Sequence, residues 1–394
     1  MVNFERMNKK RVIVSVTNDL STDQRVDRTC RTLVKMGFEV LLVGRKRRVS
    51  RPLASRTYPM HRMKLFFDKG ALFYAEYNIR LFFYLLSHKP DLLVSNDLDT
   101  LLANYLYSIL PLPRGGGACP GLPGGRGVGV VHDCHEYFRG VPELIGRNRV
   151  TAIWKGIEDR IFPKLKHVVA VNQSIAGIYT KEYGNPIRVI RNVPDHKPPE
   201  GAFDKASLGI LPEQKVILYQ GAVNVDRGLE EAILAMEYLK TDAVFLILGT
   251  GDIFEKLKIL IRQKDLGQKV IMPGPIPLET LHRYTLMGDI GLSIEKNVCI
   301  NYYYALPNKF MDYIQARVPV LVSPFPEMKA IVEQYGIGEY IENHDPAWLA
   351  SKLDSMLADE ERLGRYRRNL AGAALDLCWE KEEEKLKEIF SEKI

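Results

Sequence analysis

Short apolar runs alternate with amphipathic helical segments along nearly the whole chain, and this alternation limits the possible fold more than any other feature. Residues 11–16 and 39–43 predict strands, and residues 23–36 between them predict a helix that stops at Gly37. The same reading predicts further strands at residues 91–94, 128–131, 167–171 and 188–190, with a helix over 98–109. Parallel strands joined by helices are the simplest arrangement of this pattern, so we expect an α/β fold.

The pattern restarts after residues 195–199, whose prolines and charges predict a linker. Strands are expected at residues 216–219, 243–248 and 270–272, with helices at 229–239, 253–263, 278–287 and 327–334. A chain of 394 residues also exceeds the usual size of one core. We therefore expect two doubly wound domains in tandem, residues 1–198 and 199–375, and a charged C-terminal helix within 376–394 that packs back on the first domain.

The segment of residues 289–323 reads as strand, loop, helix and strand, with polar groups at the turns. Pro307 can begin a helix, and Asn308 and Lys309 would lie where the backbone N–H groups have no partners inside it. Such a helix end attracts anions. Asp312, one turn later, can accept hydrogen bonds from ligand hydroxyls. A diphosphate with sugar or ribose hydroxyls is the implied ligand, although ordinary helix capping is an alternative explanation.

Other polar residues follow strands, and ligands of open α/β sheets collect at the carboxyl ends of strands. Three such sites stand out. The first strand is followed by Asn18 and Asp19, and the strand over 128–131 is followed by His132 and His135, of which His132 is the more structural candidate. The third site follows the strand over 216–219 and includes Gly221, Asn224 and Arg227. Gly249 and Gly251, at the end of the strand over 243–248, are further candidates.

Composition excludes several classes of protein. No apolar run approaches the roughly 18 residues that a membrane span requires, and residues 12–16 are too short for the core of a signal peptide. The 5 cysteines lack CxxC spacing, which argues against a disulfide framework and a structural zinc site. No strand is followed by GxGxxG, which disfavours a dehydrogenase. We expect a cytoplasmic protein with reduced thiols.

Charge is distributed unevenly, because residues 1–200 carry 32 Lys+Arg and 18 Asp+Glu, a net +14, against −7 for residues 201–394. A basic and aromatic region causes part of this difference, with Arg45, Lys46, Arg47, Arg48, Phe66 and Phe67. Basic residues beside aromatic ones suit anionic lipid headgroups. The alternative is a core helix over 72–86 preceded by a solvated loop. Nucleic acid is disfavoured because no nucleic-acid-binding motif is present.

Residues 111–129 are rich in glycine and proline. These glycines precede a strand and open no helix, unlike a dinucleotide fingerprint. We expect a flexible surface loop.

Four stretches, in order, carry a resemblance to a known family: TNDLSTDQRVDR, VVHDCHEYF, GAVNVDRGLEEAI and LPNKFMDYIQARVPVLVS. With them the chain resembles family 4 of the glycosyltransferases, from about residue 11 to its C-terminus. That resemblance implies the GT-B fold, in which two Rossmann-like domains face each other across a cleft. It also implies transfer of a sugar from a nucleotide-diphosphate donor with retention of configuration, without a bound metal and without a cofactor.

The resemblance assigns roles to three residues. His135 matches a histidine that faces the reacting sugar, Arg227 matches a basic residue that contacts the donor diphosphate, and Asp312 matches the second glutamate of the E-x7-E motif, which holds the ribose. Two positions depart from the family: Ala222 replaces an arginine, and Tyr304 replaces the first glutamate. Lys309, with the helix end, is then the candidate for neutralising the diphosphate, and Glu295 or Tyr304 the candidate for the sugar contact.

The leading functional hypothesis is a glycosyltransferase that extends a lipid-linked or surface-polysaccharide precursor, with peripheral attachment to the inner face of the membrane. Two alternatives remain from the same sequence: a nucleotide-sugar epimerase of the same fold, and a non-catalytic partner that binds sugar nucleotides. The partners expected are a nucleotide sugar and a glycan or lipid-linked acceptor, and no nucleic acid.

Overall fold

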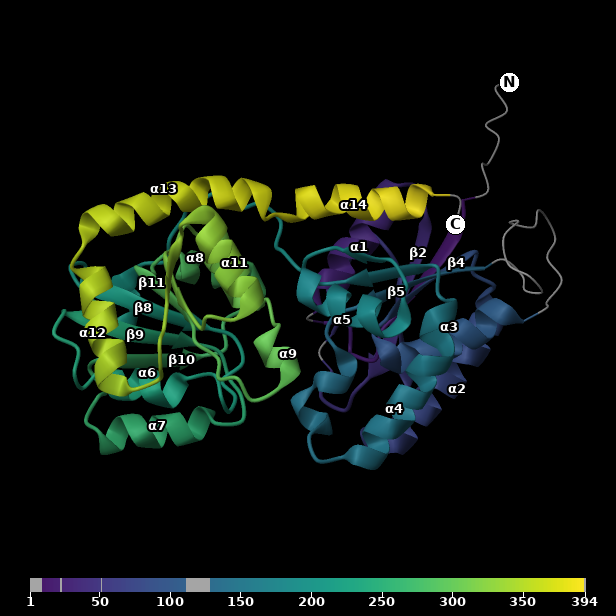
Figure 1. Ribbon diagram of the computed structural model, residues 1–394, viewed down its shortest axis with the longest axis horizontal. Helices are drawn as coiled ribbons and strands as arrows, with labels where there is room; N and C mark the ends of the chain where they lie inside the picture. The colour runs from purple at the N-terminus through teal and green to yellow at the C-terminus, as the bar shows by residue number, and fades with distance from the viewer. Residues whose placement is uncertain (1–8, 22, 51, 111–127, 393–394) are drawn as a thin grey trace, which may run out of the picture. The chain divides into compact units, whose positions relative to one another are not determined.

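The computed structural model describes residues 9–21, 23–50, 52–110 and 128–392, and its chain divides into two compact units (Figure 1). The N-terminal unit reaches Arg191 and is completed by the chain from Glu382 onward, and the C-terminal unit runs from Asn192 to Lys381. Most of the glycine-rich segment 111–129 lies outside the described residues. Each unit contains one parallel sheet covered by helices.

The sheet of the N-terminal unit has seven parallel strands among the described residues, in the order β3-β2-β1-β4-β5-β6-β7. Its order changes direction between β1 and β4, which is where doubly wound sheets bind ligands. Four residues of β1 and all of β4 are buried, as expected for strands covered on both faces. The strands are β1 (Arg11–Ser15), β2 (Glu39–Lys46), β3 (Met60–Lys64), β4 (Leu92–Asn96), β5 (Gly129–Cys134), β6 (His167–Ala170) and β7 (Ile187–Val189).

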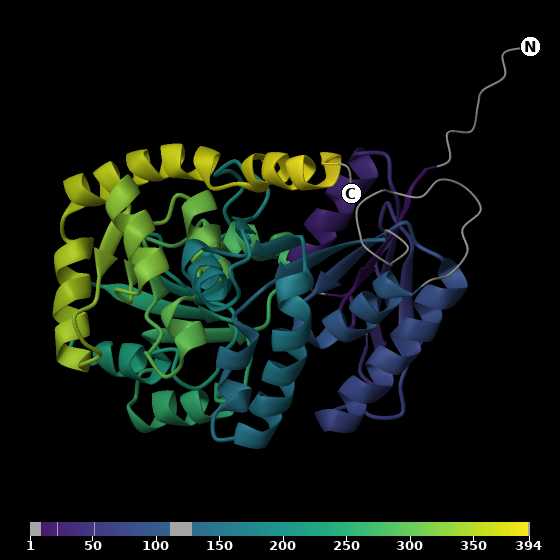
Figure 2. The same cartoon turned by 45° about the vertical axis from the view of Figure 1, so that its right-hand side comes forward.

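Figures 1 and 2 show α2, α3 and α4 gathered below the N-terminal sheet and α1 above it. One core joins the sheet to α2 and α3, with Ile13 and Leu93 packed against Tyr77 and Leu81. The helices are α1 (Gln24–Lys35), α2 (Gly70–His88), α3 (Leu98–Ile109), α4 (Asn148–Ile161) and α5 (Gln173–Tyr183), with 3-10 turns at Phe138–Gly140, Pro142–Leu144 and Phe162–Lys164.

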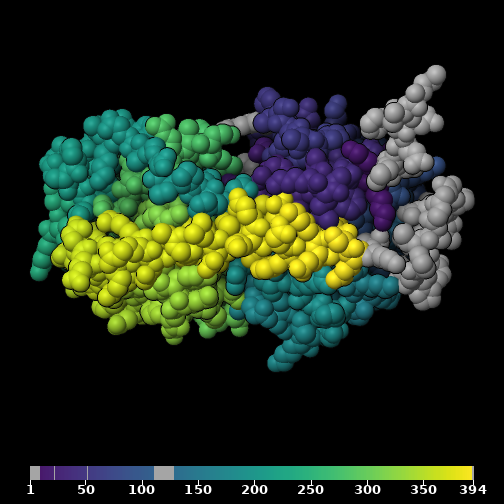
Figure 3. Space-filling model, turned by 90° about the horizontal axis from the view of Figure 1, so that it is seen from above, coloured from purple at the N-terminus to yellow at the C-terminus, as the bar shows by residue number. Residues whose placement is uncertain are grey.

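The last helix, α14 (Trp379–Ser391), returns to the N-terminal unit as predicted. It lies on α1, where the Glu383 carboxylate accepts hydrogen bonds from Thr32 and Lys35, each at 3.0 Å. Phe390 contacts Phe38 edge to face, with 6.2 Å between ring centroids. In Figure 3 this helix, in yellow, lies beside the purple N-terminal elements.

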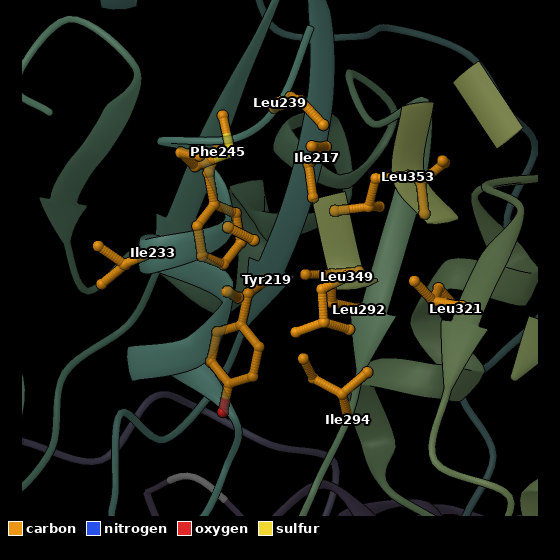
Figure 4. Packing of buried hydrophobic residues seen from close by; sticks show 14 of the residues in the cluster. Ile217, Tyr219, Ile233, Leu239, Phe245, Leu292, Ile294, Leu321, Leu349 and Leu353 are labelled. Carbon is orange, nitrogen blue, oxygen red and sulfur yellow. The ribbon is translucent and has the colours of Figure 1, made fainter. Parts of the chain in front are cut away.

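The C-terminal sheet has six described parallel strands in the order β10-β9-β8-β11-β12-β13. Side chains alternate between its faces, so Ile217 and Tyr219 join one core while Val216 and Leu218 join the other. Figure 4 shows the first of these cores. The strands are β8 (Lys215–Gln220), β9 (Ala243–Leu248), β10 (Val270–Gly274), β11 (Ile290–Ser293), β12 (Val320–Val322) and β13 (Gly338–Tyr340).

Helices cover both faces of this second sheet. Residues of α6, α7 and α12 line the core of Figure 4, and residues of α10, α11 and α13 line the opposite core. The helices are α6 (Leu229–Ala235), α7 (Phe254–Gln263), α8 (Leu278–Thr285), α9 (Ile300–Tyr303), α10 (Asn308–Gln315), α11 (Pro326–Tyr335), α12 (Pro346–Leu357) and α13 (Glu360–Asp376), with a 3-10 turn at Lys205–Leu208.

Several predicted boundaries change. The strand expected at 128–131 continues to Cys134, so His132 lies within β5 and not after it. The helices expected to reach residues 239 and 287 end at Ala235 and Thr285, and single turns follow them. The predicted strand, loop, helix and strand of residues 289–323 are confirmed, with α9 added inside the loop.

Candidate active site

Three charged side chains meet at the carboxyl edge of the C-terminal sheet. Arg227 lies in the loop after β8, Glu295 follows β11, and Lys309 is in the first turn of α10. Lys309 forms an ion pair with Oε1 of Glu295, and Nη1 of Arg227 lies 3.5 Å from the same oxygen. Ser293 donates a hydrogen bond of 3.0 Å to Oε2 of Glu295. One carboxylate therefore holds two cations, one from a loop and one from a helix.

The charges of this cluster leave it with a net positive charge. Burial acts to raise the pKa of Glu295, but Lys309 and Arg227 outweigh burial and lower the pKa, so the carboxylate is ionised at neutral pH. The Glu295 side chain is only 1% exposed and that of Lys309 is 8% exposed, against 19% for Arg227. Glu295 thus lies behind the cations, and its contact with the sugar stays a prediction.

Aromatic rings surround the two cations. The Arg227 guanidinium lies 4.3 Å from the centroid of the Tyr302 ring, and the Lys309 ammonium lies 4.9 Å from that of Tyr219. Both contacts are within the range of cation–π attraction. Nε of Arg227 is buried without a hydrogen-bond partner in the described part of the chain. Arg227 is the more accessible cation, since its side chain is 19% exposed against 8% for Lys309.

Asp312, the predicted ribose ligand, lies on α10 and is partly exposed. Its Oδ2 accepts a hydrogen bond of 2.9 Å from Nε2 of Gln220, the last residue of β8. The Gln220 amide oxygen in turn accepts a hydrogen bond of 2.7 Å from Thr285. Gln220 and Thr285 were not among the predicted site residues, although Gln220 ends a strand.

The other two predicted residues of this region have neighbours within the C-terminal unit. Oδ1 of Asn308 accepts a hydrogen bond of 2.9 Å from Asn192. The Tyr304 ring lies against that of Tyr303, with 4.9 Å between centroids, and Tyr303 in turn contacts Phe325. The position of the missing first glutamate is therefore part of an aromatic group.

The predicted glycines after β8 and β9 bring two loops into close contact. A Cβ at Gly249 would lie 1.8 Å from the carbonyl oxygen of Gly221, and a Cβ at Gly251 would lie 2.2 Å from Oδ1 of Asn224. The same Asn224 oxygen accepts a hydrogen bond of 3.1 Å from the backbone N–H of Asp252. The four predicted residues thus lie where the loops after β8 and β9 meet at the edge of the sheet.

In the N-terminal unit, His135 lies just after β5 between two carboxylates. Its Nε2 is 3.0 Å from Oδ1 of Asn96 and 3.4 Å from Oδ2 of Asp133, and its Nδ1 is 3.6 Å from Asp97. Burial acts to lower the pKa of His135, but Asp97 and Asp133 outweigh burial and raise the pKa to about 9. The imidazole is therefore protonated at neutral pH. The backbone N–H of His135 also donates to Asp97, at 2.8 Å.

A second layer of charged residues supports this group. Arg25 of α1 donates two hydrogen bonds to Asp133, at 3.0 and 2.6 Å. Burial acts to raise the pKa of Asp133, but Arg25 and His135 lower it well below its usual range. Burial raises the pKa of Asp99 to about 7. Asp97, Asp99 and Asp133 were not predicted as site residues, although Asp97 directly follows β4.

His132 is a core residue, in agreement with its structural interpretation. Its side chain is buried, Nδ1 is 3.2 Å from the Ser95 carbonyl oxygen, and the ring contacts Phe162 edge to face. Burial lowers the pKa of His132 to about 4, so the ring is neutral.

Asn18 and Asp19 shape the turn after β1. The Asn18 amide donates to Asp23 at 2.6 Å, and Asp19 accepts from the Ser21 hydroxyl at 2.5 Å and from the Ser50 hydroxyl at 3.1 Å. These bonds hold the turn and connect it to the basic loop.

The basic and aromatic residues form an exposed surface on the N-terminal unit. Lys46, Arg47 and Arg48 are exposed, and Phe66 is 84% exposed. Arg45 connects this loop to α2, since it donates to the Asp68 carbonyl at 2.8 Å and lies 4.1 Å from the centroid of the Phe73 ring. Phe67 is 44% exposed. No helix in the described ranges is long and apolar enough to cross a membrane.

The helix α2 has one buried face and one exposed apolar face. Its buried side chains are Phe73, Tyr77, Asn78, Leu81 and Leu85, which confirms part of the alternative of a core helix. Leu72, Ile79 and Phe83, however, are each about 60% exposed, at 60%, 58% and 63%. Their spacing of seven and four residues places them on one side of the helix.

Comparisons with known proteins assign the family. The model of the family "Glycosyltransferase Family 4" matches residues 23–197, and the model of the family "Glycosyl transferases group 1" matches residues 202–372. The amylovoran biosynthesis glycosyltransferase AmsK of Erwinia amylovora is 30% identical over 142 residues, which cover 35% of this chain and 33% of AmsK. Matches to the curated relatives span between 33% and 41% of those relatives' lengths.

Solved structures agree on the fold over almost the whole chain. Sucrose-phosphate synthase from Thermosynechococcus elongatus superposes with a TM-score of 0.76 at 14% identity, covering 97% of this chain and 98% of that one. HepE from Anabaena, in complex with UDP-glucose, has a TM-score of 0.70 at 12% identity and covers 97% of this chain and 99% of its own. The two family models, which together match most of the chain, show that the chain is a glycosyltransferase of family 4 with the GT-B fold.

Proposed function

We propose that the protein transfers a sugar from a nucleotide-diphosphate donor to an acceptor hydroxyl with retention of configuration and without a metal ion. The arrangement of Arg227, Glu295 and Lys309 is the observation that carries this proposal. Breaking the bond between the sugar C1 and the diphosphate oxygen leaves an electron pair on that oxygen. A net positive cluster beside the first turn of α10 would stabilise the growing negative charge.

In the proposed transfer, no covalent bond forms between the sugar and the enzyme. The acceptor oxygen bonds to C1 on the same face that the diphosphate leaves, and the proton of the acceptor hydroxyl goes to a leaving phosphate oxygen. In this proposal Asp312 binds the ribose, Arg227 with Lys309 behind it binds the diphosphate, and His135 orients the sugar. Because His135 is protonated between two carboxylates, it would act as a hydrogen-bond donor and not as a nucleophile.

A thermal-shift screen against UDP-, GDP-, dTDP- and CMP-sugars tests the donor. A ligand at 100 times its dissociation constant stabilises the folded protein by about 2.7 kcal/mol. UDP-sugars come first in the screen because HepE was solved with UDP-glucose. No shift with any nucleotide sugar would overturn the proposal, and an unchanged melting temperature in EDTA with the best donor is expected.

Turnover of the best donor tests His135. Replacing His135 by Ala should reduce turnover about 100-fold or more while donor affinity is kept, since a misplacement of the reacting group by about 1 Å costs on this scale. Unchanged turnover would remove His135 from the mechanism. Conversion of the donor without any acceptor would instead indicate an epimerase, and binding without conversion would indicate a non-catalytic partner.

We further propose that the acceptor is a lipid-linked or surface-polysaccharide precursor reached at an anionic membrane surface on the cytoplasmic side. AmsK, a named relative, acts in amylovoran biosynthesis. The exposed side of α2 supplies Leu72, Ile79 and Phe83, and the attached loop supplies Lys46, Arg47 and Arg48. Apolar side chains beside basic ones suit the interface of an anionic membrane.

Liposome flotation tests this surface. The wild-type protein should float with vesicles of phosphatidylglycerol and phosphatidylcholine at low salt, and the triple variant Leu72→Ser, Ile79→Ser, Phe83→Ser should not. The matched control changes Ile259 and Leu278, two exposed apolar residues of the C-terminal unit, to serine and should float like the wild type. Absence of wild-type binding at low salt would contradict membrane attachment.

A further inference from the structure

The Gln220 side chain is buried between three elements of the C-terminal unit. Gln220 ends β8 and is 1% exposed, and Thr285 ends α8 and is fully buried. The amide accepts from the Thr285 hydroxyl at 2.7 Å and donates to Asp312 of α10 at 2.9 Å. A buried polar side chain of this kind normally has its hydrogen bonds satisfied, and here one of its two partners is the predicted ribose ligand.

Only one orientation of this amide satisfies its neighbours. The ionised carboxylate of Asp312 accepts hydrogen bonds and cannot donate, so the NH2 group must face Asp312. The amide oxygen then faces Thr285, whose hydroxyl can donate to it. The backbone N–H of Gln220 also donates to the Tyr313 hydroxyl, at 3.2 Å, which fixes the end of β8 to α10. Hydrogen bonds thus hold both the backbone and the side chain of Gln220 in place.

We propose that Gln220, oriented by Thr285, positions the carboxylate of Asp312 for the ribose hydroxyls of the donor. The inference rests on the proposed function, in which Asp312 is the ribose ligand. Torsions next to a carboxylate are broad, so a partly exposed aspartate samples many orientations unless a neighbour restricts it. A hydrogen bond from a buried, oriented amide restricts it before the ligand arrives, and preorganisation of this kind improves affinity. Gln220 is a positioning residue and does not itself meet the ligand.

Calorimetric titration with two nucleotides separates this role from general stability. The probes are the nucleoside diphosphate of the best donor and its 2′,3′-dideoxy analogue, which lacks both ribose hydroxyls. Gln220→Leu should raise the dissociation constant of the ribonucleotide about 10-fold, as expected for the loss of one hydrogen bond to a charged group. Binding of the dideoxy analogue should stay the same.

Three further variants make the test specific. Thr285→Val should also weaken the binding of the ribonucleotide. Thr285→Ser keeps the hydroxyl and should bind the ribonucleotide like the wild type. In an Asp312→Ala background, Gln220→Leu should cause no additional loss, because the group that it positions is gone.

Gln315→Leu is the matched control. Gln315 is a glutamine of α10 that is also 1% exposed, and its amide donates to the Ala374 and Leu377 carbonyls at 2.8 and 3.0 Å. This variant should lower thermal stability and leave the ratio of the two dissociation constants unchanged.

The outcomes distinguish the two levels of the proposal. Equal weakening of both nucleotides by Gln220→Leu, or a further loss in the Asp312→Ala background, overturns the positioning role alone. If the wild-type protein binds no nucleotide, the proposed function fails and this inference fails with it. If Gln220→Leu does not fold, Thr285→Val and Thr285→Ser are compared instead. The positioning role is then decided by the ratio of the dissociation constants of the ribonucleotide and the dideoxy analogue in these two variants.

Discussion

Lys309 forms an ion pair with Glu295 in which both side chains are almost fully buried, at 8% and 1% exposure. Removing two charges from water is costly, and a pair of this kind persists only when its geometry is good and additional hydrogen bonds are made. Ser293 supplies one such hydrogen bond to Glu295, and Arg227 supplies a second positive charge. Loss of the carboxylate would leave Lys309 buried without its counter-ion.

Glu295→Gln should therefore lower the free energy of unfolding by about 3–5 kcal/mol, the usual cost of removing one partner from a buried pair. Urea denaturation at pH 7 measures this change. The control Glu230→Gln removes a pair with Lys256 at 3.2 Å in which the lysine is 70% exposed, and it should cost less than about 1 kcal/mol. Similar losses in the two variants would show that the burial of Glu295 has no energetic consequence.

The contribution of His135 to the stability of the protein should fall as the pH rises from 6.5 to about 9. Its pKa is raised in the folded state to about 9 from an ordinary value of 6.5. The stabilisation from its protonated ring is complete below pH 6.5 and is lost as the pH rises through about 9. Denaturation at a series of pH values should show a shallower fall over this interval for His135→Gln than for the wild type. An unchanged slope would show that another group titrates there.

Arg227→Ala should weaken the binding of a nucleoside diphosphate about 10- to 100-fold, because a charge-assisted hydrogen bond to phosphate is lost. The effect on a nucleoside monophosphate should be smaller. Titration of both ligands provides the measurement. Arg262→Ala, which removes an exposed arginine of α7, serves as the control and should leave both affinities unchanged. Equal losses for monophosphate and diphosphate would place Arg227 away from the diphosphate.

Gly249→Ala should destabilise the C-terminal unit by about 1–3 kcal/mol through backbone strain, with a further cost from the clash. The φ angle is +148°, and the new Cβ would lie 1.8 Å from the Gly221 carbonyl oxygen. Gly267→Ala is the control, since its Cβ would meet no atom within 4 Å. Thermal unfolding compares the two variants, and a similar melting temperature would mean that the loops after β8 and β9 can separate without cost.

The sequence predicted strands and helices best where local signals were strong. The strand at Ala243–Leu248 and the helix at Leu98–Ile109 have the predicted bounds, because one is a continuous buried run and the other begins directly after a polar turn. The strand β3 was missed because only one of its five residues, Met63, is buried, so the apolar pattern of a strand is weak. Such a pattern is common at the edge of a sheet. The helix α13 was missed because charged residues interrupt its apolar pattern.

The candidate site was only partly predictable for a different reason. Residues that follow strands could be selected because a parallel sheet brings the ends of its strands together. The partners of these residues could not be selected from the sequence. Gln220, for example, is separated along the chain from Thr285 by 65 residues and from Asp312 by 92 residues. No local pattern in the sequence indicates that Glu295 pairs with Lys309, which lies 14 residues later in the chain.

The position of α14 also affects the order in which the protein can fold during synthesis. Glu383 and Phe390 complete the packing around α1, although nearly two hundred residues of the C-terminal unit are made between them and Arg191. A ribosome therefore releases the whole C-terminal unit before the N-terminal unit can reach its native packing. The unit that is translated first is therefore the one that receives its last structural element at the end of synthesis.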